Sequence, residues 1–346
     1  MISHPSTSPR SGLWVIGTSV ALVAGLSAQQ STQKAQVDLV SNDVVVRDSK
    51  GQFVPDLWKD EFELYEDGVK QQIVSANVVT GGRIFLFFVD DLHLEFVSTG
   101  RIRGLFTTIE QRLLRDGDMF GIVSSGPSSI HVDLTFDRSQ LDNAIRAIAG
   151  NALKPADIVH DTSGAHDSSE IRYREHVAMS AAGHLLTALE AVHNRRKSVV
   201  YVIDGYGFNP LEDARPGITA GDLRRELWDL THAANRANTT FYTFAARGLV
   251  AGSDPGPNVD QTQWSQYLRN TVDTLRVLAE ETGGIAIGNQ DDVDQGLKRI
   301  DAESGDYYVL AYTSSNPDRS RRSRRIDVRV TRKGIPTVVF RKEYTP

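Results

Sequence analysis

The sequence predicts an α/β protein with a doubly wound, mostly parallel sheet, flanked by a β domain that the N- and C-terminal segments build together. Between residues 82 and 304, strand-like segments alternate with helical patterns, which is typical of right-handed βαβ crossovers. Residues 83–89 (RIFLFFV) and 198–203 (SVVYVI) are continuous apolar runs, as expected for parallel strands buried on both faces. Towards both ends of the chain, short alternating strands with glycine-bearing turns replace the helices.

The amino-acid composition limits which classes of partner and which kinds of reactive site the protein can have. The 346 residues include 38 Lys and Arg against 44 Asp and Glu, so the formal net charge is −6. This acidic balance argues against nucleic acid as the main partner. The absence of cysteine excludes disulfides, thiolate metal sites and a cysteine nucleophile.

The first residues have the pattern of an export signal. Arg10 precedes an apolar run from Leu13 to Leu26, and the small residue Ala28 follows shortly after. This order predicts a secretory signal peptide over residues 1–28, cut after Ala28. The run is shorter than the ~20 apolar residues of a membrane-spanning helix. We therefore expect an exported protein, periplasmic or secreted, with no membrane span after cleavage. An uncleaved N-terminal anchor is the alternative.

Two segments follow the signal. The N-terminal β segment covers residues 36–80, with strands expected at 37–40, 43–47 and 62–65. The α/β domain covers residues 82–304, with strands expected at 83–89, 119–124, 130–134, 198–203, 239–245 and 284–287. Its helices are expected at 99–115, from a cap at Ser139, and at 172–192, 222–237, 264–281 and 293–300.

The C-terminal β segment covers residues 305–346, with strands expected at 307–312, 326–331 and 337–341. Neither terminal segment has enough strands for a stable sheet of its own, because an isolated hairpin is marginal in water. We therefore expect the two ends to build one sandwich-like domain, with the α/β domain inserted between them. Two separate β appendages are the alternative.

Acidic side chains follow two of the expected central strands. Asp90 and Asp91, with His93 close behind, end the first apolar run, and Asp204 ends the second. Because the carboxyl ends of neighbouring parallel strands meet at one edge of a sheet, we expect these side chains to lie close together. Like charges at close range need a cation or a hydrogen-bond donor, and Mg²⁺ would bind through oxygen ligands. Asp90, Asp91, His93 and Asp204 are therefore candidate ligands of a metal site for an ion such as Mg²⁺. The alternative is that Asp90 and Asp91 cap the following helix or face solvent.

Three segments of the chain occur in a characteristic order. They are residues 44–73 (VVVRDSKGQFVPDLWKDEFELYEDGVKQQI), residues 197–200 (KSVV) before Asp204-Gly205, and the strands at 307–313 (YYVLAYT) and 324–344 (RRIDVRVTRKGIPTVVFRKEY). Together they resemble the VWFA-related Acidobacterial domain family, a bacterial group of von Willebrand factor type A-related proteins. The resemblance covers nearly the whole mature chain. It implies a doubly wound sheet and, as in type A domains generally, a metal-ion-dependent adhesion site.

In type A domains that site takes an Asp-x-Ser-x-Ser loop, a Thr from a second loop and an Asp from a third. Asp204 matches the last of these, and Thr162 is the candidate for the Thr. Other side chains stand at the two serine positions whichever acid leads: Leu92 and Leu94 after Asp90, or His93 and Glu95 after Asp91. The resemblance therefore implies a degenerate metal site.

The sequence favours a non-enzymatic protein-interaction or adhesion module. Rigid strands would present the loops at the carboxyl edge to a protein partner, with Tyr206 and Phe208 as partner-binding side chains. No set of nucleophile, base and orienting group can be assembled, and no Gly-x-Ser-x-Gly motif occurs. Two alternatives stay open. One is a structural component of the cell envelope, and the other is a metal-dependent hydrolase at Asp90, Asp91, His93 and Asp204.

The densest charge of the chain is a run of five arginines between Arg319 and Arg325. In an acidic protein such a run can contact an anionic surface, such as lipid headgroups. A solvated loop between two strands is the favoured interpretation.

Overall fold

The computed structural model describes residues 39–80, 82–163, 169–192, 195–211, 220–250, 255–318, 320 and 323–344. Every element described below lies in one compact unit, Asp38–Pro346. The expected signal peptide, residues 1–28, lies outside the described residues. Within the described part, no helix is both long and apolar enough to cross a membrane.

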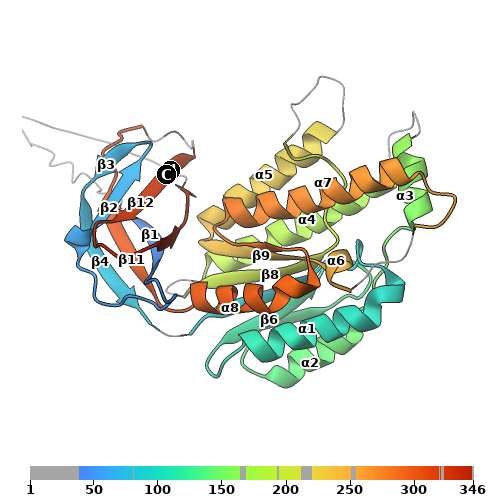
Figure 1. The fold of residues 1–346 in the computed structure, drawn as a ribbon, viewed down its shortest axis with the longest axis horizontal. Coiled ribbons are helices and arrows are strands. Elements are labelled where there is room, and N and C mark those ends of the chain that lie inside the picture. Colours follow the sequence, from blue (N-terminus) through green and yellow to red (C-terminus); the bar gives the residue numbers. More distant parts are fainter. Residues whose placement is uncertain are drawn as a thin grey trace, which may run out of the picture. The chain divides into compact units, whose positions relative to one another are not determined.

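A six-stranded sheet forms the centre of the α/β domain (Figure 1). Its strands are β5 (Ile84–Val89), β6 (Met119–Ser124), β7 (His131–Thr135), β8 (Lys197–Ile203), β9 (Thr239–Ala245) and β10 (Ala286–Ile287). They lie in the order β10-β9-β8-β5-β6-β7, and all neighbours are parallel except β6 with β7. The chain runs outward from β5 to β7 on one side and from β8 to β10 on the other. The topological switch point, where open α/β sheets bind ligands, therefore lies between β5 and β8.

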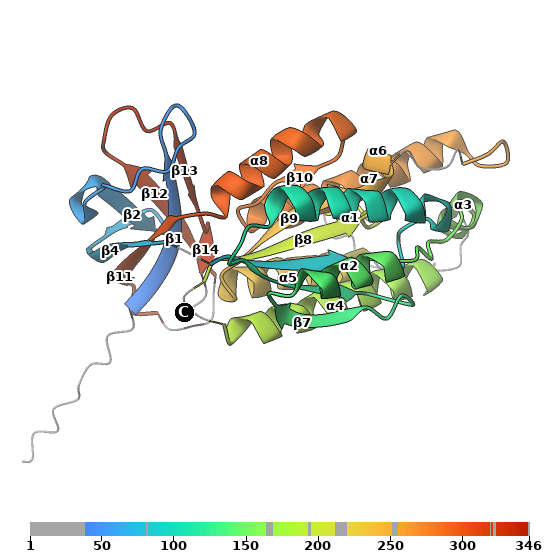
Figure 2. The ribbon, with the colours of Figure 1, turned by 90° about the horizontal axis from the view of Figure 1, so that it is seen from below.

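Helices cover both faces of this sheet (Figure 2). Side chains of β5 alternate between two cores, with Phe85 and Phe87 in one and Leu86 and Phe88 in the other. The first core includes side chains of α1 (Thr99–Leu113), α2 (Arg138–Ala147) and α8 (Val293–Glu303). The second includes side chains of α4 (Ser169–Glu190), α5 (Ala220–Arg236) and α7 (Gln261–Glu281).

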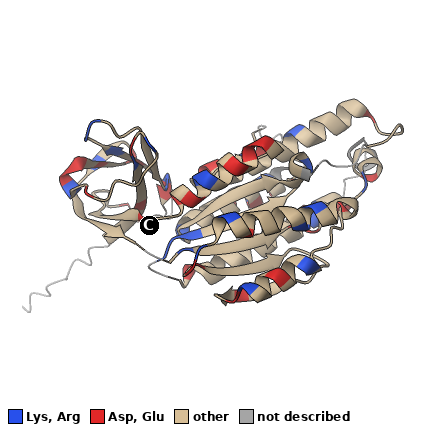
Figure 3. Cartoon of the chain, turned by 60° about the horizontal axis from the view of Figure 1, so that its bottom comes forward, with Lys and Arg blue, Asp and Glu red and all other residues tan. Residues whose placement is uncertain are grey.

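Burial on both faces explains the continuous apolar runs in the sequence. Strands β5, β6 and β9 contain no Lys, Arg, Asp or Glu, whereas both signs of charge lie on the covering helices (Figure 3). The doubly wound, mostly parallel α/β fold predicted from the sequence is confirmed.

The flanking β domain is a sandwich of two four-stranded sheets (Figure 1). The N-terminal segment supplies β1 (Leu39–Arg47), β2 (Phe62–Glu66), β3 (Val69–Gln71) and β4 (Ile73–Val79). The C-terminal segment supplies β11 (Tyr307–Thr313), β12 (Arg324–Val330), β13 (Thr337–Phe340) and β14 (Glu343–Tyr344). The strand orders are β13-β1-β11-β4 and β14-β12-β2-β3.

Each sheet of the sandwich needs strands from both ends of the chain. Val44 of β1 pairs with Tyr308 of β11, and Leu64 of β2 pairs with Val328 of β12. These four side chains share one buried core. The prediction that the two ends build one flanking β domain is confirmed.

Some boundaries differ from the expectation for local reasons. The strands expected at 37–40 and 43–47 form one strand, β1. Ser139 is not the cap of α2, because the carboxylate of Asp137 accepts the backbone N–H of Ser139 at 3.0 Å. Asp137 therefore caps the helix.

Two short helices form where the sequence analysis placed no helix. In α3 (Pro155–Ser163), Ile158 and Val159 pack with Trp264 of α7, so tertiary burial stabilises this helix. The five-residue helix α6 (Ala246–Val250) follows β9 directly. Short 3₁₀ turns complete the described chain: η1 (Lys59–Glu61), η2 (Phe96–Ser98) and η3 (Gln290–Asp292).

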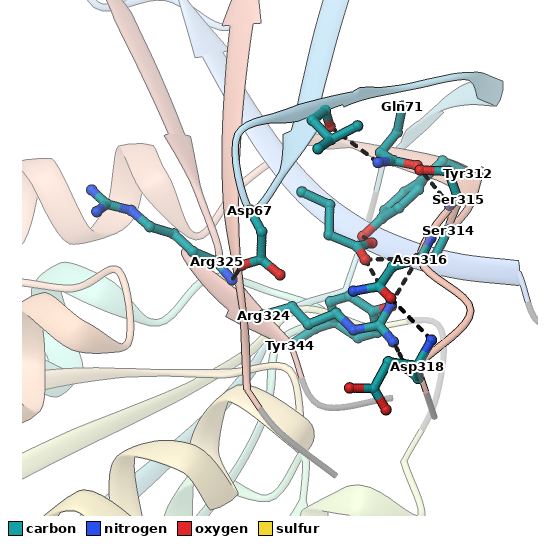
Figure 4. A network of polar contacts seen from close by, with 12 residues as sticks. Asp67, Gln71, Tyr312, Ser314, Ser315, Asn316, Asp318, Arg324, Arg325 and Tyr344 are labelled. Atoms are coloured by element: carbon teal, nitrogen blue, oxygen red, sulfur yellow. Dashed lines mark hydrogen bonds and ion pairs between the residues drawn. The ribbon is translucent and has the colours of Figure 1, made fainter. Parts of the chain in front are cut away.

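One member of the arginine run is buried in the sandwich (Figure 4). Arg324 is 3% exposed, and its Nη1 donates to Glu66 Oε1 at 2.6 Å and to Ser314 Oγ at 2.7 Å. The hydroxyl of Tyr312 donates to Glu66 Oε2 at 2.9 Å. Arg324 is therefore a structural ion-pair partner and is not available to an anionic surface. Such contact stays a prediction for the exposed Arg325 and for the arginines outside the described residues, Arg319, Arg321 and Arg322.

Candidate functional site at the carboxyl edge of the central sheet

The switch point between β5 and β8 brings the predicted acids to one edge of the sheet. Asp90 follows β5 directly, and its backbone N–H donates to the carbonyl of Val202 in β8 at 3.1 Å. The segment from Asp90 to Glu95 follows β5, and the segment that begins at Asp204 follows β8. The carboxyl edge therefore carries Asp90, Asp91 and Asp204 together.

Asp90 and His93 form a buried ion pair. His93 Nδ1 lies 2.9 Å from Asp90 Oδ2, and the side chain of Asp90 is fully buried. Asp90 also accepts hydrogen bonds from Ser125 Oγ at 2.6 Å and from the Tyr201 hydroxyl at 3.2 Å. Burial, the largest single influence, lowers the pKa of His93. The charge and hydrogen bond of Asp90, together with the charges of Glu175 and Asp204, outweigh burial and raise that pKa above its usual value. When protonated, His93 thus balances the charge of Asp90 from within the protein.

Asp91 is held by donors from the loop after β6. The backbone N–H of Ser128 donates to Asp91 Oδ2 at 2.6 Å, and Ser125 Oγ donates to Asp91 Oδ1 at 3.2 Å. Burial raises the pKa of Asp91, although the hydrogen bonds from Ser128 oppose the rise. Both carboxylate oxygens of Asp91 are therefore used inside the protein.

Arg247, the second residue of α6, is the counter-ion of Asp204. Its Nη2 lies 3.0 Å from Asp204 Oδ2, and its backbone N–H donates to Asp204 Oδ1 at 2.6 Å. Its Nη1 lies 3.0 Å from Glu95 Oε1. The guanidinium also lies over the ring of Trp264, 4.9 Å from the ring centroid. One side chain thus joins the segment after β5 to the segment after β8.

These contacts do not form a ligand set for a divalent ion. The predicted ligands lie in two groups, each with its own protein counter-charge: Asp90, Asp91 and His93 in one, and Asp204 in the other. Across the ranges that the structure describes, no group of three or more His, Asp or Glu is placed to hold a metal ion. The side chain of Thr162 lies outside the described residues. The residues present therefore do not fit Mg²⁺, which needs several free oxygen ligands.

The predicted partner-binding side chains, Tyr206 and Phe208, point into the protein. Tyr206 is fully buried, Phe208 is 7% exposed, and their rings stack with centroids 6.2 Å apart. The Tyr206 hydroxyl shares a hydrogen bond with that of Tyr201, and the Tyr206 backbone N–H donates to Thr274 Oγ1 at 3.0 Å. In this conformation the two rings support the loop from inside. Direct contact with a partner stays a prediction, and it would require this loop to open.

Glu175 of α4 supports the same loop and was not singled out from the sequence. Its Oε1 accepts the backbone N–H of Gly207 at 2.7 Å, and the side chain is 2% exposed. Burial raises the pKa of Glu175 to about 7, although the charge of His93 opposes the rise. The sequence signal was an acid on the apolar face of a helix, between Ile171 and Met179.

Arg247 could also have been found from the sequence. It comes two residues after the apolar strand β9, at the same edge where Asp90 and Asp204 follow their strands. The strand-end rule that selected the two acids applies equally to a cation.

Three exposed apolar side chains lie in the segments that carry these buried charges. Phe96 and Val97 of η2 are 72% and 69% exposed, and Leu211, after the Asp204 segment, is 71% exposed. The segment before η2 is held by Arg174, whose Nη1 donates to the carbonyl of Leu92 at 3.2 Å. The edge thus has charges inside and apolar groups outside, the reverse of an ordinary surface loop.

No family model matches this chain, and no curated protein matches it. Among solved structures, it is similar to the three N-terminal domains of the type V pili tip protein Mfa5 from Porphyromonas gingivalis. The identity is 7% and the TM-score 0.38, over 90% of this chain and 78% of that one. It is also similar to the vWF domain of the same protein, with 10% identity and a TM-score of 0.33, over 65% of this chain and 95% of that one. Membership of the Acidobacterial domain family stays a prediction.

Proposed function

We propose that the chain is an exported, non-enzymatic protein-interaction or adhesion module that binds a protein partner at the carboxyl edge of its central sheet. The observation that carries the proposal is the exposure of Phe96 and Val97 on a short turn anchored by buried ion pairs. Large apolar side chains presented by a rigid scaffold favour protein contact, because their burial against a partner is favourable and costs little ordering.

The chemistry of the same edge argues against the hydrolase alternative. Asp90 and Asp91 are fully buried, and His93 is committed to the ion pair with Asp90. The single hydroxyl proton of Ser125 is shared between Asp90 and Asp91. Asp90 also pairs with His93 and Asp91 also accepts the Ser128 N–H, so neither carboxylate is a free base for a serine nucleophile. A substrate would reach none of these groups without opening the edge.

The pattern of residues 1–28 supports export of the mature chain. A structural role in the cell envelope remains the second candidate, since an inert component would also lack a catalytic set. The two candidates differ in whether the exposed turn has a specific partner.

Site-specific crosslinking tests this difference. A photoreactive amino acid at Phe96 of the full-length chain, expressed in its native host, is expected to give a discrete crosslinked product. The matched control is Phe136, which is 56% exposed and follows β7, the antiparallel strand, so it lies at the opposite edge of the sheet. A product from Phe96 that disappears in the Val97→Ser background, and is absent from Phe136, would support the proposal. Equal products from both positions, or none from Phe96, would contradict it.

A further inference from the structure

We propose that Arg247 takes the place of a divalent metal ion at the carboxyl edge. Its guanidinium holds the segments after β5 and β8 together without a bound metal ion. The inference concerns how the edge is held and stands whether or not the edge binds a protein.

The guanidinium occupies the position where a bridging cation would have to lie. It contacts one carboxylate from the segment after β5, Glu95, and one from the segment after β8, Asp204, both at 3.0 Å. The two acids are 7% and 6% exposed, so they face each other with little screening by water. Two ionised carboxylates buried close together repel each other, and a positive charge between them offsets this repulsion.

The structure fixes this cation more firmly than a surface arginine. The guanidinium carbon lies over the ring of Trp264 in α7, and the side chain of Arg247 is 14% exposed. The helix that carries it is also held in place, because a Cβ at Gly248 would lie 2.0 Å from the carbonyl oxygen of Gly288. The helix α6 therefore packs directly against the segment after β10, and Arg247 has little freedom to leave.

A guanidinium and a metal ion would compete for the same oxygens. While Arg247 is present, Glu95 and Asp204 cannot both turn towards a metal. Without Arg247, the two carboxylates would face a space that a hard divalent ion can fill through oxygen ligands and water. The proposal thus predicts that removal of one side chain makes the stability of the protein depend on metal.

The test measures the midpoint of thermal unfolding of the full-length chain in EDTA and in millimolar MgCl₂. The wild-type midpoint is expected to be the same in both. Arg247→Ala is expected to lower the midpoint in EDTA by roughly 5–10 °C, because it leaves buried carboxylates unpaired. MgCl₂ should restore part of that loss. The matched control is Arg101→Ala, an exposed arginine of α1, which should change neither midpoint.

Two results would overturn the proposal. One is a wild-type midpoint that rises by several degrees in MgCl₂ and loses the rise in Asp204→Asn. The other is an Arg247→Ala variant that loses no stability or gives the same midpoint in both buffers. If that variant does not fold, the triple variant Arg247→Met, Glu95→Gln, Asp204→Asn removes all three charges at once. It is expected to fold and to be insensitive to MgCl₂, and failure to fold would also contradict the proposal.

Discussion

Each edge of the central sheet contains an arginine that binds two carboxylates. At the amino edge, Arg83 donates from Nη2 to Asp118 Oδ2 at 2.5 Å and from Nη1 to Asp301 Oδ1 at 2.7 Å. At the carboxyl edge, Arg247 plays the same part between Asp204 and Glu95.

Arg83 and Arg247 differ in the elements that they join. Arg83 and Asp118 precede the neighbouring strands β5 and β6, and Arg83 Nε also donates to Asp118 at 3.0 Å, which gives a bidentate pair. Arg247 Nη1 and Glu95 Oε1 make an ion pair without the geometry of a hydrogen bond. The amino edge is thus bound into regular structure, whereas the carboxyl edge joins loops. The same charge arrangement therefore joins residues at the starts of strands at one edge and the segments that follow strands at the other.

The largest effect is expected at the amino edge. Arg83→Met should lower the free energy of unfolding by about 4 kcal/mol, because it leaves Asp118 buried and unpaired. Urea unfolding measures the loss, and Arg247→Met provides the comparison. Arg112→Met is the control, since Arg112 also pairs with an aspartate but is half exposed, and should cost under about 1 kcal/mol. A larger loss for Arg247→Met than for Arg83→Met would break the comparison between the edges.

The carboxyl edge should show a pH dependence that comes from Glu175. Its pKa is raised from 4.5 to about 7 by burial, so between these values the folded state binds a proton that the unfolded chain has released. Stability from this group is therefore full at low pH and falls as the pH rises towards 7. Glu175→Gln keeps an acceptor for the Gly207 N–H and removes the titration.

Urea unfolding at pH 5 and pH 8 measures this dependence. Between these pH values, the wild type should lose about 2 to 3 kcal/mol relative to Glu175→Gln. Glu280→Gln, on an exposed acid of α7, serves as the control. An unchanged difference between wild type and Glu175→Gln at the two pH values would show that Glu175 is ionised throughout.

The smallest effect is expected inside the loop after β8. Tyr206→Phe removes a buried hydroxyl that bonds to Tyr201, and should cost about 1 kcal/mol in the free energy of unfolding. Tyr65→Phe is the control, because its half-exposed hydroxyl bonds to Glu63 and can be replaced by water. If Tyr206→Phe is without effect while crosslinking from Phe96 is lost, the Tyr206 hydroxyl acts in binding and not in support.

The fold was predictable because burial on two faces leaves a continuous signal. The apolar runs gave β5 and β8 within one residue at each end, and β9 without error. The helix α3 was missed because its stability comes from Trp264, a residue distant in sequence. A hydrophobic pattern in the sequence indicates which face of a helix is apolar, but it does not identify the distant residue that packs on that face.

The site was predictable only in part for a related reason. The strand-end rule placed Asp90 and Asp204 at one edge, but it could not show which charge would balance them. A metal ion and a guanidinium satisfy the same electrostatic need, and only the position of Arg247 in the fold decides between them. Similarly, the position of Tyr206 in a loop predicts an exposed ring. Its burial follows from tertiary contacts, such as the hydrogen bond with the Tyr201 hydroxyl, which the sequence does not reveal.

The pairing of strands in the sandwich sets an order of assembly during synthesis. Strand β1 lies between β13 and β11, and β4 pairs with β11. Strands β1 and β4, which are synthesised early, therefore cannot pair until the C-terminal strands have been synthesised. The α/β sheet, by contrast, has all its strands once β10 has been made. A chain broken off before Tyr307 leaves β1 and β4 with bare edges, which are targets for proteases and for aggregation. Chains that stop before β11 therefore expose unpaired strand edges, which are covered when the C-terminal strands are present.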